Sequence, residues 1–457
     1  MQKNIFIPLI LFFGELIKYT LSEIRLPFRI LHRNNNDSTL FIDKLTQNQI
    51  YTNISFGTPP QQIQLIFKMP FELFYLPSSL INTASSGTMT CTSTSDLPID
   101  FEEVERGYYC TDIVYLNNTG KRVDFVLNEK NGGDYGSIGL LIQQESTRTN
   151  IYPFFQSLSK SNLIKSYTWT LKYFKNISLL DSINGDGVVG EFIFGDEPHK
   201  YEKDQTLYPV ENYHVINPTP ESGYLFWDFE FNDVYLTLKN GSYIFFEGTK
   251  KAEINPESNY LVGPSGYFTE MKKLFFSEYF DENICIEEKI NNKNYGYISC
   301  DKNKFNYNNF PILTFEHKSL ENKFNLTGND LFVLDSKTNK YIFLIFTSQY
   351  TVSKWILGSP FLKNHQLIFD NDKKTIGYYV ANITNSEKEK EKESKTSYII
   401  ISVLVLVIIT IFVGTGVLIK KGIIQLPRKK RANELEENII YEENGGKNND
   451  DIGNINS

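Results

Sequence analysis

The sequence is poor in the residues that most often bind metals. Its 457 residues include only five histidines and four cysteines. The cysteines, at positions 91, 110, 285 and 300, form no Cys-x-x-Cys pair, which argues against a zinc site. The histidines are scattered along the chain. We therefore predict neither a metal site nor a cofactor.

The chain also lacks an excess of positive charge. Lys and Arg number 46 and Asp and Glu number 54, which gives a net charge of -8. Apart from the short basic run at 428–431 there is no basic stripe, so we do not expect a nucleic-acid partner. No short repeat is visible, and no Ser or Cys lies in a nucleophile-elbow context.

Aromatic residues are abundant, with 35 Phe and 28 Tyr, and they favour strands. Short apolar runs are separated by Gly, Asn and Pro, as in the strand–turn–strand pattern of residues 51–67. Further strands are expected within 190–196, 227–238 and 340–346, and a helix over 153–164. We predict an all-β body of two lobes with short helices, at residues 51–215 and 216–383.

The two ends of the chain carry apolar segments outside this body. Residues 1–22 have the form of a secretory signal peptide, with a buried N-terminal strand as the alternative. Residues 398–419 contain no charge and are long enough to cross a bilayer as a helix; the alternative is a buried core helix. Lys420 and Lys421 follow this span, which predicts a cytoplasmic tail over 420–457. A charged stalk is expected at 384–397.

This topology places the body in the secretory pathway or at the cell surface, where disulfides form. Among the three possible connectivities we favour the local pairs Cys91–Cys110 and Cys285–Cys300. Glycosylation sequons precede the span, at Asn36, Asn53, Asn117, Asn176, Asn240, Asn325 and Asn382.

Four segments carry a resemblance to a known family. They are "ISFGTPPQQIQLIF" (54–67), "DYGSIGL" (134–140), "NYLVGPSGYF" (259–268) and "WILGSPFLKNHQLIFDNDKKTIGYYVA" (355–381). Together they make the body similar to the pepsin-like aspartic proteases, and "IRLPFRI" within residues 23–50 resembles the start of a short pro-segment. The resemblance implies a bilobal β fold in which two Asp, one per lobe, share a proton across a cleft and activate a water.

Neither Asp is found where the resemblance places it. Without gaps, the first Asp-Thr-Gly loop falls on Lys68, Met69 and Pro70, and the second on Asn255, Pro256 and Glu257. Lysine carries the opposite charge, and an asparagine amide cannot exchange the proton. Pro70 also replaces a glycine and removes a backbone donor. The family's flap sequence falls near residues 100–103, which do not match it; the alternative is a misalignment in a variable loop.

The sequence therefore indicates a membrane-anchored pseudoprotease that binds a peptide or protein between its lobes. The alternatives are an active aspartic endopeptidase with unorthodox catalysis and a structural surface glycoprotein. Asp181, Asp186 and Asp370 have no symmetric partner that would restore the pair. One hypothesis is that Lys68 forms an ion pair across the lobes, with Glu257 or Glu253; the alternative is that its side chain reaches solvent along the cleft.

Overall fold

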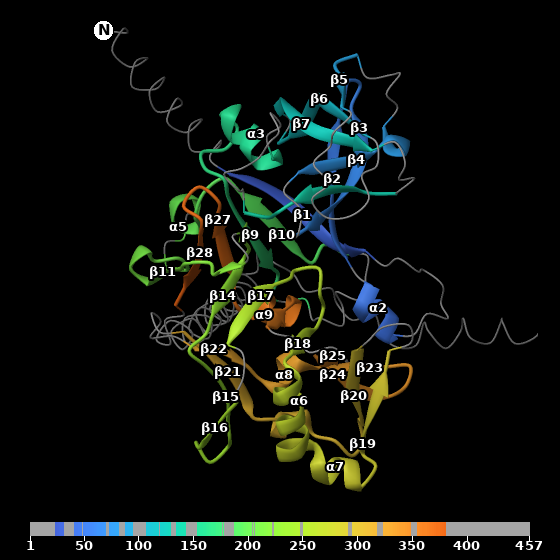
Figure 1. Cartoon of the computed structure of the whole chain (residues 1–457), viewed down its shortest axis with the longest axis vertical. Coiled ribbons are helices and arrows are strands. Elements are labelled where there is room, and N and C mark those ends of the chain that lie inside the picture. The colour runs from blue at the N-terminus through green and yellow to red at the C-terminus, as the bar shows by residue number, and fades with distance from the viewer. Residues whose placement is uncertain are drawn as a thin grey trace, which may run out of the picture. The chain divides into compact units, whose positions relative to one another are not determined.

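The computed structural model shows a mostly β, bilobal body with short helices (Figure 1). The residues it describes are 23–31, 41–47, 49–69, 73–81, 87–94, 107–117, 119–128, 134–142, 153–175, 177, 187–202, 204, 206–221, 224–246, 250–290, 295–317, 323–348 and 354–380.

The strands of the N-terminal lobe belong to a 13-stranded sheet. The order of its strands is β11-β28-β27-β9-β10-β1-β2-β3-β8-β4-β7-β6-β5. Its strands are β1 (Ile24–Leu31), β2 (Gln49–Phe56), β3 (Gln61–Lys68), β4 (Phe74–Pro77), β5 (Thr90–Thr94), β6 (Gly107–Leu116), β7 (Thr119–Asn128), β8 (Gly136–Gly139), β9 (Thr168–Tyr173), β10 (Gly190–Phe194), β11 (Tyr213–Ile216), β27 (Leu367–Asp370) and β28 (Thr375–Tyr379). Because β27 pairs with β9, this sheet joins the C-terminal end of the body to the first lobe.

The C-terminal lobe is built on a 9-stranded and a 4-stranded sheet, with orders β14-β17-β26-β18-β25-β20-β24-β23, where β19 pairs with β20, and β16-β15-β21-β22. The strands are β14 (Asp228–Glu230), β15 (Asp233–Thr237), β16 (Tyr243–Phe245), β17 (Lys251–Ile254), β18 (Leu261–Gly263), β19 (Cys285–Lys289), β20 (Tyr295–Asp301), β21 (Ile312–Glu316), β22 (Lys323–Leu326), β23 (Phe332–Asp335), β24 (Lys340–Phe343), β25 (Ile345–Ser348) and β26 (Trp355–Leu357). The short strands β12 (Pro220–Glu221) and β13 (Tyr224–Leu225) pair with each other.

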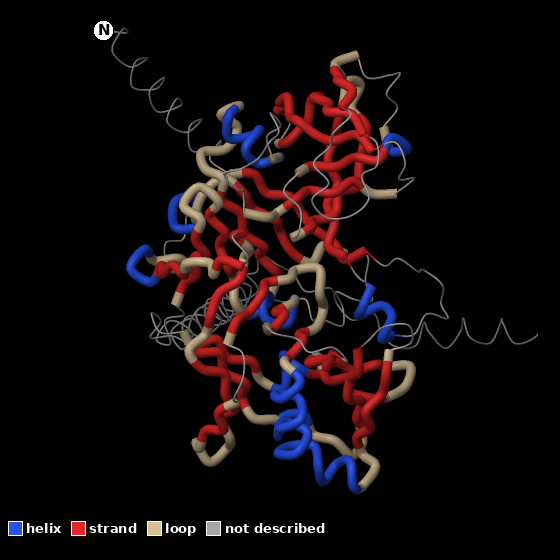
Figure 2. Tube along the Cα trace, in the orientation of Figure 1, coloured by secondary structure: helices blue, strands red, loops and turns tan. Residues whose placement is uncertain are grey.

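Helical segments are short and lie between the strands (Figure 2). They are α2 (Phe41–Gln47), η1 (Ser78–Leu80), α3 (Phe154–Lys160), α5 (Pro198–Tyr201), η2 (Val210–Asn212), α6 (Ser265–Met271), the π-helical η3 (Lys272–Phe276), α7 (Ser277–Asp281), η4 (Tyr307–Asn309), α8 (Gly328–Leu331) and α9 (Ser359–Asn364).

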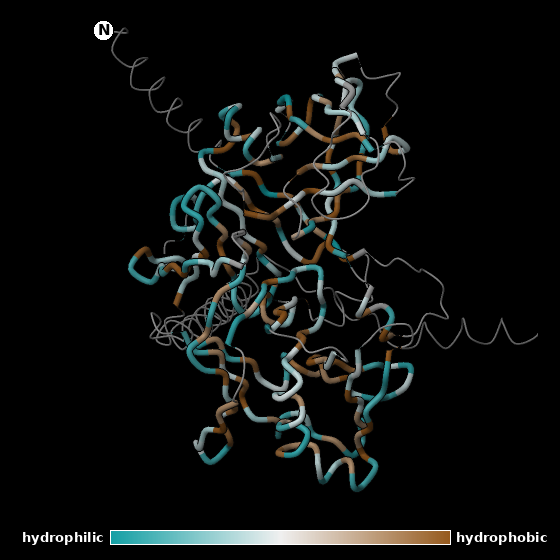
Figure 3. Tube along the Cα trace, viewed as in Figure 1, coloured by the Kyte–Doolittle hydropathy of each residue, from teal (hydrophilic) through white to brown (hydrophobic). Residues whose placement is uncertain are grey.

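The core forms because apolar and polar residues alternate along the strands. In β2, Ile50, Thr52, Ile54 and Phe56 are buried, whereas the residues that alternate with them are partly or fully exposed. Figure 3 shows the resulting change between apolar and polar positions along many of the strands. Aromatic rings fill the main core, for example Trp169 stacked on Phe369 with centroids 4.0 Å apart.

The strand–turn–strand predicted at 51–67 is confirmed by β2 and β3. The helix predicted over 153–164 is too long, because α3 ends at Lys160 and Asn162 has a left-handed φ of 55°. The single strand predicted over 227–238 is also wrong. Its two halves, β14 and β15, belong to different sheets, and Asn232 between them donates to the carbonyl of Glu316.

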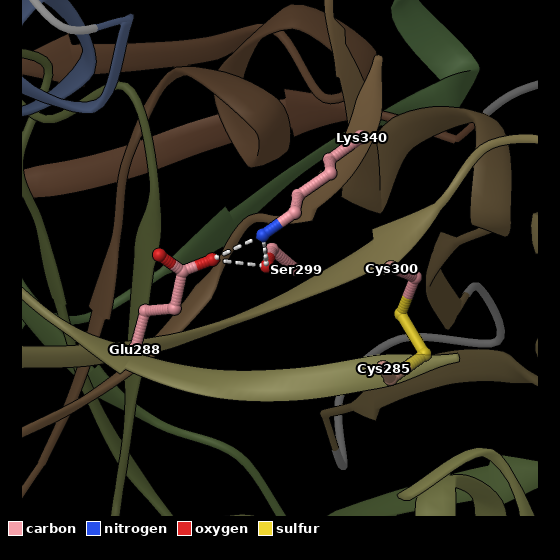
Figure 4. Close-up of a disulfide and its surroundings, with 5 residues drawn as sticks. All are labelled: Cys285, Glu288, Ser299, Cys300 and Lys340. Carbon is pink, nitrogen blue, oxygen red and sulfur yellow. Dashed lines mark hydrogen bonds and ion pairs between the residues drawn. A yellow bond between two sulfur atoms is a disulfide. The ribbon is translucent and has the colours of Figure 1, made fainter. Parts of the chain in front are cut away.

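Both local disulfides, Cys91–Cys110 and Cys285–Cys300, are confirmed. Each joins residues that face each other on paired antiparallel strands. Beside the second bond, Lys340 Nζ lies 3.1 Å from Glu288 Oε1, to which the Ser299 hydroxyl also donates (Figure 4). The hairpin β19–β20 is therefore held by a covalent and a polar cross-strand link.

Several predictions concern residues outside the described part of the chain. These are the signal peptide at 1–22, the stalk at 384–397, the span at 398–419 and the tail at 420–457. Among the described residues, no helix has both the length and the apolar character needed to cross a membrane.

Candidate functional site

The first loop of the candidate site begins where β3 ends at Lys68. β3 runs parallel to β8, with Lys68 opposite Gly139, and the Lys68 carbonyl accepts from the Leu140 amide at 2.9 Å. Met69, which follows, is only 7% exposed, whereas the Lys68 side chain is partly exposed. Pro70 lies outside the described residues. Strand pairing therefore fixes the backbone at Lys68.

The second loop begins where β17 ends and contains Asn255, Pro256 and Glu257. The Asn255 amide donates to the Leu357 carbonyl at 3.0 Å, which extends the parallel pairing of β17 with β26. The Asn255 side-chain oxygen accepts from the Glu257 amide at 3.0 Å and so closes its own turn. Asn255 is therefore a structural residue of this loop.

A close backbone approach holds the second loop against β26. A Cβ atom at Gly358 would lie 2.2 Å from the Ser258 carbonyl oxygen and 2.3 Å from that of Tyr260. Only glycine fits at this position without moving the loop. The next amide, from Ser359, donates to the Ser258 carbonyl at 2.7 Å.

The two loops meet through a hydrogen bond between the lobes. The Met69 amide donates to Glu257 Oε1 at 3.2 Å, across 188 positions of sequence. The structure thus brings Glu257 to the first loop, as the predicted ion pair requires. The contact between Lys68 and Glu257 themselves stays a prediction.

A second connection between the loops passes through Trp227. Its indole Nε1 donates to the carbonyl of Leu140 at 2.6 Å, and the Leu140 amide in turn bonds Lys68. The backbone carbonyl of Trp227 accepts at 3.4 Å from the amide of Ile254, the residue before Asn255. The side chain is 2% exposed and packs edge-on against Trp169. Both loops are therefore tied to one buried residue, the first through its indole and the second through its backbone carbonyl.

Two loops at strand ends, one from each lobe, meet in a bilobal β body with two disulfides. The profile of the family described as Eukaryotic aspartyl protease matches residues 49–381, most of the chain. The chain belongs to this family. A comparison with curated proteins found no match.

The four cysteines of this aspartyl protease family member are paired in two disulfides. Because disulfides form in oxidising compartments, this pairing suggests the secretory pathway. Of the predicted glycosylation sites, Asn53, Asn117, Asn240 and Asn325 are exposed. The remaining three, Asn36, Asn176 and Asn382, lie outside the described residues. Exposure leaves the four sites accessible; their occupancy stays a prediction.

A charged cluster that the sequence did not reveal lies beside the second loop of this family member. Asp228 is 0% exposed and receives Lys354 Nζ at 3.0 Å, and the same ammonium lies 2.7 Å from Glu253. Burial raises the pKa of Asp228, and Lys354 opposes part of that rise. Glu253, the second predicted partner of Lys68, is thus bound by Lys354. The pairing of β14 with β17 and of β17 with β26 brings these groups together.

Of the three other acids considered from the sequence, the structure describes Asp370. Asp370 is buried, accepts from the Lys373 amide at 2.8 Å and pairs with the Lys373 ammonium, so it closes the turn between β27 and β28. Asp181, Asp186 and the flap region at 100–103 lie outside the described residues.

Proposed function

We propose that this family member is a pseudoprotease: Lys68 and Asn255 occupy the positions of the two catalytic acids, and the lobes bind a peptide or protein without cleaving it. The hydrogen bond from Met69 to Glu257 carries this proposal. It supports the alignment of the two triplets, because it joins the same two loops that the sequence pattern identifies.

The chemistry argues against the usual mechanism. Peptide hydrolysis by this family requires two carboxylates that share one proton and hold a water between them. At this junction the acid in contact with the opposite loop is Glu257, and it accepts from a backbone amide. Asn255 uses its side-chain oxygen to close its turn and has no proton to exchange. A lysine ammonium cannot replace the second carboxylate.

We also propose that residues 398–419 anchor the chain in a membrane of the secretory pathway or cell surface. The uncharged span followed by Lys420 and Lys421 supports this proposal. The body would then lie on the lumenal or extracellular side. Protease protection of the body in sealed microsomes, with cleavage of the tail from outside, tests this orientation.

A cleavage assay tests the loss of proteolysis. The full chain and its Glu257→Gln variant are incubated with an unfolded protein substrate from about pH 2 to about pH 7. We expect no cleavage by either. Acid-dependent cleavage that disappears in Glu257→Gln would identify an active endopeptidase with unorthodox catalysis and would overturn the proposal.

A capture experiment separates a binding protein from a structural glycoprotein. The immobilised chain is presented with a random peptide library and compared with Lys68→Glu, at the loop junction, and Lys289→Glu, on the exposed strand β19. We expect captured peptides to be lost with Lys68→Glu and kept with Lys289→Glu. Equal capture by all three proteins would favour the structural alternative.

A further inference from the structure

The segment that resembles a pro-segment is built into the first lobe. β1 pairs with β10 over Ile24–Phe28 and with β2 over Arg29–Leu31, so it is an internal strand of the sheet. Its alternate side chains enter the core, and a Cβ at Gly190 would lie 2.5 Å from Phe28. Arg25 also lies within 3.2 Å of carboxylate oxygens of Glu23, Glu191 and Glu202.

The next element of the same segment packs on the other lobe. Phe41, Ile42 and Leu45 of α2 are buried, and their spacing places them on one side of the helix. They form a separate core cluster with side chains of the C-terminal lobe, namely Ile290, Tyr297, Val333, Ile342, Leu344 and Phe346. In Figure 1 the blue α2 accordingly lies beside strands coloured yellow to orange.

The surface under α2 is the outer side of the 9-stranded sheet. Side chains alternate along β20, so Ile298 and Cys300 point into the main core while Tyr297 points to α2. The same division holds in β24, where Phe343 belongs to the main core and Ile342 to the α2 cluster. Among the described residues, the helix is therefore the element that covers this apolar face.

This face extends to the second loop of the candidate site. Tyr260 packs against the α2 cluster and stacks on Phe346, with ring centroids 4.3 Å apart. Its carbonyl accepts from the Ser258 hydroxyl at 2.8 Å. Glu257, which receives the Met69 amide, immediately precedes Ser258. Loss of α2 would thus free one side of the loop that contacts the first lobe.

We propose that α2 is an internal ligand of a helix-binding surface on the C-terminal lobe. The surface accepts an amphipathic helix with two adjacent apolar residues and a third one turn later. A seven-residue helix is too short to be stable alone, so α2 owes its helical form to this surface. Its attachment to the same chain gives it a high effective concentration and lets it exclude a free helix of similar affinity.

Hydrogen exchange on the full chain tests the proposal with Leu45→Asp and a matched control. Leu45 is 1% exposed in the α2 cluster, whereas Leu274→Asp places the same charge at a leucine that is 45% exposed. We expect Leu45→Asp to accelerate amide exchange about tenfold in residues 255–261 and in β20 and β24. Exchange in β6 and β7 should not change, and Leu274→Asp should resemble the wild type.

A peptide of residues 39–49, added at about 1 mM, supplies the helix in trans. It should restore slow exchange in Leu45→Asp and have no effect on the wild type. Unchanged exchange at 255–261 in Leu45→Asp would overturn the proposal. So would faster exchange throughout the body, including β6 and β7, in both Leu45→Asp and the milder Phe41→Ala, because α2 would then be an inseparable part of one core.

Discussion

The loops that begin at Lys68 and at Asn255 follow strands that are paired in the same way, but the hydrogen bonds within the two loops differ. Each continues a strand that runs parallel to a neighbour, β8 in the first lobe and β26 in the second. Within the loops, Asn255 accepts from its own turn, whereas the Met69 amide donates to the opposite lobe. Strand pairing therefore holds both loops in place, whichever side chains the loops carry.

The largest effect is expected from the residue that both loops share. Trp227→Ala removes a buried indole and its bond to Leu140, which should lower the free energy of unfolding by about 3–5 kcal/mol. Denaturant titration followed by circular dichroism measures the loss. Trp227→Phe, which keeps a ring and loses the donor, should fall between the variant and the wild type. A loss below about 1 kcal/mol for the alanine variant would show that the indole does not hold the first loop.

The second largest effect is expected beside the Asn255 loop alone. Lys354→Met removes the ammonium shared by Asp228 and Glu253, and we expect a loss of roughly 2–3 kcal/mol at about pH 7, because Asp228 stays buried with less compensating charge. Lys250→Met removes a pair with Asp233 whose members are both exposed, and should change stability by less than about 0.5 kcal/mol.

The sign of the pH dependence follows from the pKa of Asp228. Burial raises this pKa in the folded chain, so folding is favoured by protonation of the carboxyl, and stability falls as the pH rises from the ordinary value through the raised one. Removal of Lys354 raises the pKa further. The loss in Lys354→Met should therefore be smaller at about pH 4 than at about pH 7. An equal loss at both values would contradict this account of the cluster.

The sequence predicted those features of the fold that depend on residues close together in the chain. Residues Gly57 to Pro60 form the turn between β2 and β3, and the apolar run before Lys68 forms the expected buried strand. Cysteines close in sequence formed the local disulfides. These features follow from turn chemistry and alternation, which act over a few residues.

The contacts between distant parts of the chain could not be predicted in the same way. Trp227 and Leu140, Asp228 and Lys354, and α2 and β24 meet only after distant strands have paired. Residues 227–238 look like one strand because they contain few turn signals, yet a change of sheet at Asn232 divides them. No residue near Phe41 and Leu45 indicates that the surface they cover belongs to the other lobe.

A smaller effect is expected from the contact between the loops. Lys68→Met and Glu257→Gln, singly and together, form a double-mutant cycle in which each single variant should lose about 1 kcal/mol, since both side chains are only partly buried. An ion pair predicts a coupling energy of about 0.5–1 kcal/mol. Additive losses would rule out the pair and leave the Met69 amide as the partner of Glu257.

The smallest effect is expected when an acid is introduced at Asn255 in the second loop. In Asn255→Asp a carboxylate oxygen can still accept from the Glu257 amide, so stability should change by less than about 0.5 kcal/mol, whereas Asn255→Ala should lose about 1 kcal/mol. Lys68→Asp should lower the free energy of unfolding more than Asn255→Asp does. It replaces a positive charge by a negative one in the first loop, which contacts the carboxylate of Glu257. Denaturant titration of the three variants measures this asymmetry. Equal changes in the free energy of unfolding for Lys68→Asp and Asn255→Asp would mean that the charge of Glu257 does not affect the two positions differently. The two loops would then be more alike than their hydrogen bonds indicate.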